Sequence, residues 1–530
     1  MTSGPSSLPQ RTVGEWQVRS GSAYATPFAD VAVEAVFTGP DGGSVTMPGF
    51  HDGDGTWKVR FNPGQPGRWT FAISSRPANP DLAASGAFEV TPRDFHGFLR
   101  ATPGQGFGFS YENGDPVFLF GDTVYNLFGM NWCGGDVGGF LRRRKQQGFN
   151  ILRIRVPVSP FHHPDGYSEW QTRRTWAWGG SEQEPMFDRF NLDWFANVDA
   201  VVQLCEQLDI GIEMIMEGWG FEFPFCDRTR FTAEWEELWM RYLIARYDAY
   251  NCLYAWTPLN EYEYYPAGIF IHKPVADRWA IRIARWIKAT APHGHVVVMH
   301  NGPRLPPFAE RFRADPEAVD AIFYQEWGTR DEAQGWLAAG IEEQIGAALA
   351  GWQGSAVFAE WGYERNPSFK LKLPSHEFCD RGHTRRGGWR GVFCGMGIIT
   401  GFENSWGPWM LLEEDQPGLP DLLHLRRFVT ETIPFARMVP APDLLVDAEA
   451  PRGERASALA TSGRDVVAVY LPVGGSVKLS LPAGSRSARW FDPRTGEFQA
   501  APADAGSFRS PSTSSDGRNP DDWILLLTSH

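Results

Sequence analysis

The sequence lacks the cysteine spacing of a zinc ribbon or a disulfide scaffold. Its six cysteines are scattered along the chain and include no CxxC pair (Cys133, Cys205, Cys226, Cys252, Cys379 and Cys394). This pattern excludes a dense disulfide framework and favours reduced thiols. No metal or other cofactor is expected, because the adjacent His162 and His163 point in different directions and have no convincing third ligand.

Long hydrophobic runs are also missing. No stretch of about 20 apolar residues occurs, so we expect no membrane-spanning helix and no membrane partner. The opening segment MTSGPSSLPQRTVGEW has no basic stretch followed by an apolar one, which is the pattern of an export signal. We therefore expect a cytoplasmic protein.

Positive charge is in the minority. There are 49 Lys and Arg residues against 63 Asp and Glu, which gives a net charge of −14. This balance argues against nucleic acid as a partner and favours a neutral ligand. Tryptophan, by contrast, is abundant at 23 residues. An indole packs well on the C–H face of a sugar ring, although aromatic rings also fill large cores, so a neutral carbohydrate is the expected substrate. The sequence does not predict the oligomeric state.

The chain length of 530 residues predicts about three domains. Residues 1–94 contain short alternating apolar segments between turn clusters such as GPDGG, which predicts an N-terminal β-sandwich resembling immunoglobulin-like modules. Residues 438–530 contain the strand candidates DVVAVYLP, VKLSLP, ARWFDP and DWILLLT, which predict a second β-sandwich.

Between these regions, residues 95–437 alternate strand-like and helix-like segments. The strand candidates are PVFLFGD, NILRIRV, GIEMIM, LYAWTPL, HVVVMH, AIFYQE, SAVFAE and MGIITGF. The helix candidates between them, such as AEWEELWMRYLIARY, carry apolar residues at intervals of three and four. Eight βα units close into a barrel, so the predicted fold class is α/β, a (β/α)8 TIM barrel flanked by two β-sandwiches.

Two glutamates stand at the ends of predicted barrel strands. Glu261 follows the run LYAWTPLN, and Glu360 ends the run SAVFAE. The carboxyl ends of barrel strands carry the active site in this fold. Cleaving a glycosidic bond requires one carboxylic acid to protonate the leaving oxygen and one carboxylate to stabilise or trap the oxocarbenium-like centre. We therefore predict Glu261 and Glu360 as the catalytic pair.

Other residues at the same strand ends are candidates for the site. Glu217, Glu263, Glu326 and Glu403 are competing carboxylates, and Glu263 is the strongest rival for the acid and base. By strand position, Asp122 is predicted to accept hydrogen bonds from sugar hydroxyls or to cap the following helix. Trp406 is predicted to form the floor of the sugar subsite or to close the barrel. The long segment 157–191 is expected to shape the pocket.

The spans LYAWTPLNEYEYY and SAVFAEWGY resemble those of clan A retaining glycoside hydrolases. The segments FLFGDTVYNLFG, FNILRIRV, PLNEY, FAEWG and ARWFDPRTGEF are similar to those of the apiosidase-like bacterial group, whose members carry an N-terminal immunoglobulin-like domain and a C-terminal domain labelled as collagen-binding. The resemblance implies that Arg153 hydrogen-bonds the nucleophile and that Asn260 meets the sugar 2-hydroxyl. It also implies that Tyr324 donates to Glu360, although Gln325 is an equally good inward residue.

The function expected from these features is that of a retaining, exo-acting glycoside hydrolase. Glu360 is the expected nucleophile and Glu261 the acid and base, and the substrates are expected to be small glycosides or oligosaccharides, including plant-derived furanosides or pentose-containing ones. Two alternatives stay open: a non-catalytic carbohydrate-binding protein and a transglycosidase. A third alternative is an adhesion or scaffold protein, whose function would not be impaired by changing either glutamate.

Overall fold

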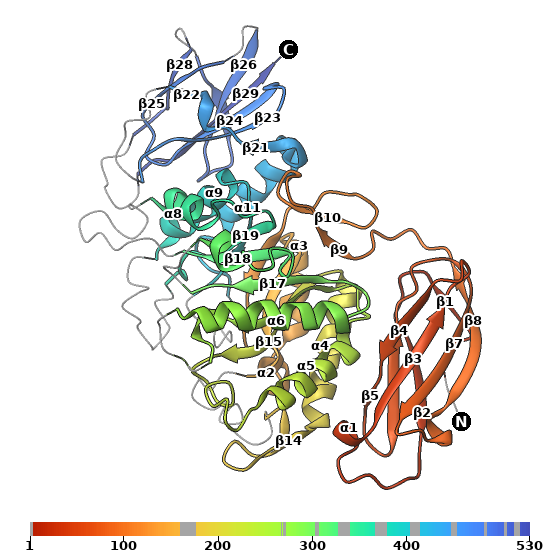
Figure 1. The fold of residues 1–530 in the computed structure, drawn as a ribbon. Coiled ribbons are helices and arrows are strands. Elements are labelled where there is room, and N and C mark those ends of the chain that lie inside the picture. The colour runs from red at the N-terminus through yellow and green to blue at the C-terminus, as the bar shows by residue number, and fades with distance from the viewer. Residues whose placement is uncertain are drawn as a thin grey trace.

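The computed structural model describes residues 4–158, 176–266, 268, 272–302, 307–326, 340–365, 379–402, 414–446, 453–481, 485–502, 506–513 and 520–529. In it, a closed barrel lies between a β-sandwich at each end of the chain, and the two termini lie far apart (Figure 1).

Eight parallel strands form the barrel. In barrel order they are β11 (Phe120–Thr123), β12 (Ile151–Arg155), β15 (Gly211–Trp219), β16 (Leu253–Asn260), β17 (Val296–His300), β18 (Ala321–Gln325), β19 (Ser355–Glu360) and β20 (Gly397–Thr400). Pairing of β11 with β20 closes the barrel. Each strand lies within or overlaps one of the eight predicted apolar runs, so the predicted fold class is confirmed.

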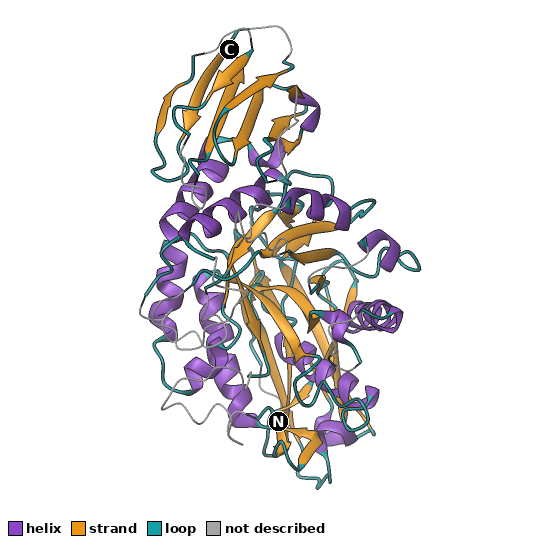
Figure 2. Cartoon of the chain, turned by 90° about the vertical axis from the view of Figure 1, so that its left-hand side faces the viewer, coloured by secondary structure: helices purple, strands orange, loops and turns teal. Residues whose placement is uncertain are grey.

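Helices surround these strands (Figure 2). They are α2 (Leu127–Trp132), α3 (Val137–Gln146), α4 (Leu192–Leu208), α5 (Ala233–Tyr247), α6 (Pro274–Thr290), α7 (Phe308–Arg311), α8 (Ile341–Ala348), α9 (Arg381–Phe393) and α11 (Leu419–Arg427), which continues as a π-helical turn at Phe428–Thr432. Several begin with a side-chain cap: Asn191, for example, accepts a hydrogen bond from the Trp194 N–H at the start of α4.

Helix α9 was not predicted, because its sequence RGHTRRGGWRGVF is rich in glycine, which disfavours helices. Its glycines allow the helix to lie close to its neighbours. A Cβ added at Gly387 would lie 2.1 Å from the Trp361 ring, and one at Gly391 would lie 2.7 Å from Phe358. Close packing on β19 therefore outweighs the low helix propensity.

Two hairpins accompany the barrel. The strands β9 (Leu99–Ala101) and β10 (Phe109–Tyr111) precede it, and β13 (Trp178–Gly180) and β14 (Pro185–Phe190) lie between β12 and α4. The second hairpin occupies part of the segment 157–191 that was expected to shape the pocket. Residues 159–175 of that segment, with His162 and His163, lie outside the described residues.

The N-terminal sandwich consists of two sheets around a shared apolar core that contains Trp16 and Trp57. One sheet has the order β1 (Ser7–Pro9), β8 (Ala84–Thr91), β7 (Gly67–Arg76), β3 (Ala32–Thr38) and β4 (Ser44–Pro48). The other has β2 (Gly14–Arg19), β6 (Thr56–Phe61) and β5 (Phe50–His51), and the short helices Pro27–Asp30 and Pro80–Leu82 connect strands.

A buried ion network joins this sandwich to the barrel. Asp199 on α4 accepts hydrogen bonds from Arg60 on β6, at 2.9 Å, and from Arg246 on α5, also at 2.9 Å. Arg246 in turn donates to Asp52 of the sandwich at 2.8 Å. Because all three of Arg60, Arg246 and Asp199 are buried, each charge depends on its partner across the domain boundary.

The C-terminal sandwich also has two sheets. The larger has the order β21 (Met438–Pro440), β23 (Ser457–Thr461), β24 (Val466–Leu471), β29 (Trp523–Ser529), β26 (Arg486–Phe491) and β27 (Phe498–Ala500). The smaller has β22 (Leu445–Val446), β25 (Ser476–Leu479) and β28 (Ser507–Arg509). Asp522 of this domain pairs with Arg385 on α9 at 2.9 Å, which attaches the sandwich to the barrel.

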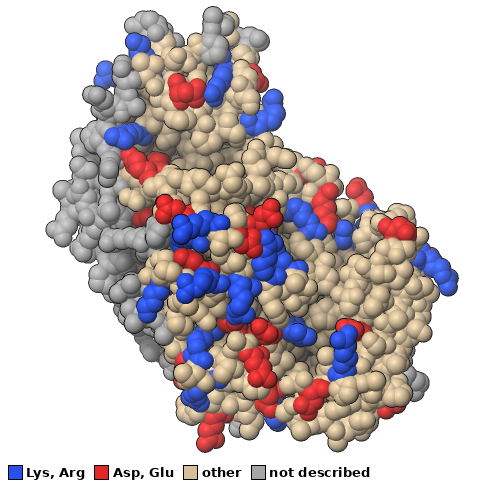
Figure 3. Space-filling model, viewed as in Figure 1, with Lys and Arg blue, Asp and Glu red and all other residues tan. Residues whose placement is uncertain are grey.

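Acidic and basic side chains are interspersed on the face shown in Figure 3, so its described surface does not carry a charge of one sign. Among the described helices, none combines the length and hydropathy needed to cross a bilayer.

Candidate active site

Glu261 and Glu360 lie at the same end of the barrel. Glu261 directly follows β16, and Glu360 is the last residue of β19. Gln325 on β18 links them, because it pairs in register with Glu360 and its Nε2 donates to Glu261 Oε1 at 3.2 Å. The two carboxylates therefore face the same region above the barrel.

Glu360 is buried, with an exposed fraction of 5%. Its Oε2 accepts a hydrogen bond from the Tyr125 hydroxyl at 3.2 Å and lies 3.5 Å from Nη1 of Arg153. His300 Nε2 is 3.9 Å from the same oxygen. Burial and the nearby Arg153 lower the pKa of His300 well below its usual value, so its imidazole is neutral.

Arg153 connects the two strand ends. Its Nη2 donates to Asn260 Oδ1 at 2.9 Å, while its Nη1 faces Glu360. The Nδ2 of Asn260 is buried and has no hydrogen-bond partner among the described residues. That amide is thus oriented by Arg153 and has a donor available for a ligand.

Glu261 differs from Glu360 in its electrostatic environment. Burial raises the pKa of Glu261 well above its usual value, and the negative charges of Glu360 and Glu263 raise it further. The backbone of Glu261 is left-handed, with φ of 52° and ψ of 61°, a conformation that costs a non-glycine residue about 1–2 kcal/mol. The site therefore places a carboxyl group with a raised pKa near Glu360, which faces a guanidinium.

This electrostatic difference predicts a stability effect. Because the folded state raises the pKa of Glu261, ionisation of this side chain destabilises the fold as pH rises above the ordinary carboxyl range. We expect Glu261→Gln to raise the melting temperature at pH 8 and to leave it unchanged at pH 4. Thermal unfolding at both pH values is the measurement, with exposed Glu234→Gln as the control. An equal shift at both pH values would contradict the electrostatic explanation.

An aromatic cluster lines the barrel beside Glu360. Tyr125, Trp219 and Tyr363 form it together with Ile215, and Phe221 stacks on Trp219 with ring centroids 5.6 Å apart. The Tyr125 and Tyr363 hydroxyls lie 3.1 Å apart. The sequence analysis missed these residues, although Tyr125 and Tyr363 occur in the segments GDTVYN and FAEWGY around predicted site residues.

Comparison with sequence families identifies the chain. The family described as the apiosidase-like catalytic domain matches residues 105–417, which is more than half of the protein and includes the site described above. The chain belongs to the apiosidase-like family. On its two sides, a domain of unknown function (DUF5060) matches residues 10–76, and the family "Putative collagen-binding domain of a collagenase" matches residues 439–528. No curated protein matches this apiosidase-like chain.

Solved structures share the fold of this apiosidase-like protein. A Bacteroides vulgatus protein described as a "putative glycoside hydrolase" has a TM-score of 0.71 and 16% identity, with 99% of this chain and 100% of that chain covered. A family 5 glycoside hydrolase from the same organism has a TM-score of 0.61 and 18% identity, covering 82% of this chain and 94% of that one. A further glycoside hydrolase has a TM-score of 0.58 and 17% identity, with coverage of 82% and 97%. Family membership, together with this fold, supports a glycosidase.

Two predicted substrate-binding residues of the apiosidase-like protein lie elsewhere. Tyr324 points away from Glu360, and its hydroxyl donates to Glu326 at 3.3 Å. Gln325 faces inward, because it alternates along β18 with Ala321 and Phe323 of the inner apolar cluster, and a register shift brings Glu360 opposite it. Asp122 is buried in an ion pair with Arg144 of α3 at 2.8 Å. It therefore faces the helix layer, so the predictions of sugar contact for Asp122 and of donation to Glu360 for Tyr324 are wrong.

The competing carboxylates are held by other partners. Glu217 pairs with Arg228 at 2.6 Å, and Glu263 accepts a hydrogen bond from the Gly302 N–H at 2.9 Å and lies near Arg311. Glu326 accepts from Tyr324. Trp406 and Glu403 lie outside the described residues. Glu261 and Glu360, by contrast, are linked to each other through Gln325.

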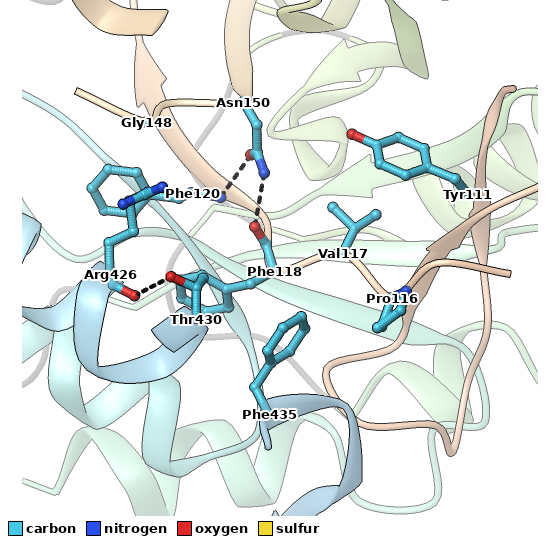
Figure 4. A pocket seen from close by; sticks show the side chains of 10 residues that line it. All are labelled: Tyr111, Pro116, Val117, Phe118, Phe120, Gly148, Asn150, Arg426, Thr430 and Phe435. Atoms are coloured by element: carbon cyan, nitrogen blue, oxygen red, sulfur yellow. Dashed lines mark hydrogen bonds between the residues drawn. The ribbon is translucent and has the colours of Figure 1, made fainter. Parts of the chain in front are cut away.

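A cavity of about 250 Å³ lies at the opposite end of the barrel (Figure 4). Its polar side chains are already occupied: Asn150 bonds the backbone of Phe118 and Phe120, and Thr430 donates to the Arg426 carbonyl. It lies near the amino ends of β11 and β12, whereas TIM-barrel chemistry occurs at the carboxyl ends. We therefore do not assign the reaction to this cavity. Within the described residues, no group of three or more His, Cys, Asp or Glu side chains is arranged to hold a metal ion.

Proposed function

We propose that this protein is a retaining glycoside hydrolase in which Glu360 is the nucleophile and Glu261 the acid and base. The observation that carries the proposal is the contrast between the two carboxyl groups at one barrel end. Glu360 faces the positive charge of Arg153, while the raised pKa of Glu261 favours the protonated form of that carboxyl. Double displacement needs this combination of an ionised nucleophile and a protonated acid.

In the first step, a Glu360 carboxylate oxygen attacks the anomeric carbon and the bond to the leaving oxygen breaks. Glu261 transfers its proton to that oxygen, so the aglycone leaves as a neutral alcohol. The products are a covalent glycosyl-enzyme ester at Glu360 and an ionised Glu261.

In the second step, Glu261 removes a proton from water, which attacks the anomeric carbon and breaks the ester to Glu360. Consuming the charge of Glu360 in the ester removes one cause of the raised pKa of Glu261, so the same group can change from acid to base. Two displacements at one carbon return the sugar with its original anomeric configuration.

Neighbouring side chains of the proposed site orient the reactants. The available Nδ2 of Asn260 is a donor for the sugar 2-hydroxyl, and Gln325 fixes the Glu261 carboxyl. The aromatic rings beside Glu360 offer apolar surface to a sugar ring. The proposed substrates are small neutral glycosides or oligosaccharides cleaved from one end, and the family to which the chain belongs favours furanosides and pentose-containing ones.

A panel of nitrophenyl furanosides and pyranosides in both anomeric forms tests this proposal. We expect one glycone to be hydrolysed, and NMR of the first product formed to show the anomer of the substrate. An inverted first product would refute double displacement. A panel that stays intact, followed by sugar binding without cleavage of oligosaccharides, would favour the non-catalytic binding protein. Transfer of the sugar to added alcohols in preference to water would identify a transglycosidase.

A further inference from the structure

We infer that Glu213 is a positioning residue that fixes the orientation of Arg153 beneath the reacting carboxylates. Glu213 lies on β15 and has an exposed fraction of 0%. Its Oε2 accepts a hydrogen bond from Nε of Arg153 at 2.9 Å, and its Oε1 accepts one from the Thr257 hydroxyl at 2.7 Å. This inference rests on the function proposed above.

The guanidinium group of Arg153 contacts residues of three strands. Nε donates to Glu213 on β15 and Nη2 donates to Asn260 on β16. On β19, Nη1 donates to the Ala359 carbonyl at 3.5 Å and lies 3.5 Å from Glu360 Oε2. Arginine donors are arranged in a rigid planar fork, so fixing Nε also fixes the directions of both Nη groups. The position of Glu213 therefore sets how Arg153 approaches the other two residues.

The 3.5 Å approach between Arg153 and Glu360 has a chemical consequence. An arginine that is not held by a second carboxylate tends to form a bidentate pair with the nearest one, with two short hydrogen bonds. Such a pair would engage both oxygens of Glu360 and remove the donor that orients Asn260. Because Glu213 holds Nε of Arg153 by a hydrogen bond, the guanidinium cannot close on Glu360 as a bidentate pair, and the carboxylate oxygens of the nucleophile stay reactive.

Glu213 also balances charge in this buried region. Burial raises the pKa of Glu213, while the charge of Arg153 and the hydrogen bonds that both oxygens accept act in the opposite direction and favour a carboxylate that partly cancels the charge of Arg153. The other titratable groups that face Arg153 or Glu360 are Tyr125, Glu261, His300 and Tyr363. Without the charge of Glu213, the positive charge of Arg153 beside the reacting carboxylates would be less compensated.

Two substitutions separate position from charge. Glu213→Ala removes the acceptor for Nε, and we expect kcat to fall about 100-fold with a much smaller change in KM. Glu213→Gln keeps an oxygen acceptor but removes the charge. For this variant we expect a smaller fall in kcat, and an acidic limb of the kcat/KM profile displaced by about one pH unit toward lower pH.

Glu217→Gln is the matched control. Glu217 is also fully buried on β15, but it pairs with Arg228, so neutralising it should leave the acidic limb in place. If both glutamine variants lose activity equally and neither profile moves, the role of Glu213 is structural and the inference is wrong.

A crystal structure of Glu213→Ala tests the inference without using activity. We expect the Arg153 guanidinium to turn away from Asn260 and to close on Glu360 as a bidentate pair. An unchanged guanidinium would overturn the inference even in an active enzyme. Conversely, the turned guanidinium in a protein that cleaves no glycoside would support the positioning role and reject the proposed function, so the two failures are distinguishable.

Discussion

Glu360→Gln should abolish turnover while the protein stays folded. The amide has nearly the shape of the carboxylate and can still accept from Tyr125, but it cannot form the glycosyl ester. Loss of a catalytic nucleophile typically lowers kcat by a factor on the order of 10⁴ or more. Release of nitrophenol from the glycone that the wild type cleaves is the measurement, with circular dichroism and the melting temperature as tests of folding.

Glu326→Gln is the control for this result. Glu326 is another buried carboxylate at a strand end, directly beside Glu360 in the barrel, since its N–H donates to the Glu360 carbonyl. Its side chain accepts from Tyr324 on the helix side, so this variant should retain most of the wild-type activity. If Glu360→Gln kept the turnover rate of the wild type, or if both variants lost activity equally, the assignment of the nucleophile would be wrong.

Glu261→Ala should lower activity in a way that depends on the leaving group. Without the acid, a poor leaving group departs unprotonated, and we expect a loss of about 10²- to 10⁴-fold for alkyl glycosides. Dinitrophenyl glycosides need little protonation, so their first step should be nearly unaffected, and the slow second step should allow the glycosyl-enzyme to accumulate. Pre-steady-state release of dinitrophenol measures this burst.

Azide should restore turnover of Glu261→Ala with an activated substrate. The anion needs no general base, so it can attack the glycosyl-enzyme where Glu261 has been removed, giving a glycosyl azide of the substrate's configuration. Glu263→Gln is the comparison variant, because Glu263 is bonded to Gly302 and lies near Arg311. Azide rescue in a Glu263 variant, and none in Glu261→Ala, would transfer the acid and base role to Glu263.

The barrel was predictable because its strands are short apolar runs between amphipathic segments. All eight runs form strands, and the sequence AEWEELWMRYLIARY matches α5 from its first to its last residue. Helix α9 was not predictable in this way. Its glycines are explained only by the positions of Trp361 and Phe358, which come from another part of the sequence.

Only the site residues at the ends of predicted strands could be predicted from the sequence. The ends of β16 and β19 led to the prediction of Glu261 and Glu360. The resemblance predicted a hydrogen bond from Arg153 to the nucleophile, and in the structure its Nη1 lies 3.5 Å from Glu360 Oε2. Alternation along β18 already points Gln325 inward, but the irregularity on β19 that brings Glu360 opposite Gln325 was not predictable from a local pattern. A local sequence pattern also does not predict ion pairs between separate elements, such as the pair in which Arg144 holds Asp122 on the outer face of the barrel.

The Asp199 carboxylate, which Arg60 and Arg246 both contact, affects which fragments of this chain can fold by themselves. Arg60 of the sandwich and Arg246 of the barrel both depend on it, and the sandwich side chain Asn62 also donates to the Ala249 carbonyl behind α5. A fragment trimmed to the barrel alone would keep Asp199 and Arg246 but expose them on a surface shaped for another domain. The smallest piece expected to fold by itself therefore includes the N-terminal sandwich. Recombination that exchanged either part for one from a distant relative would have to exchange both sides of this junction together.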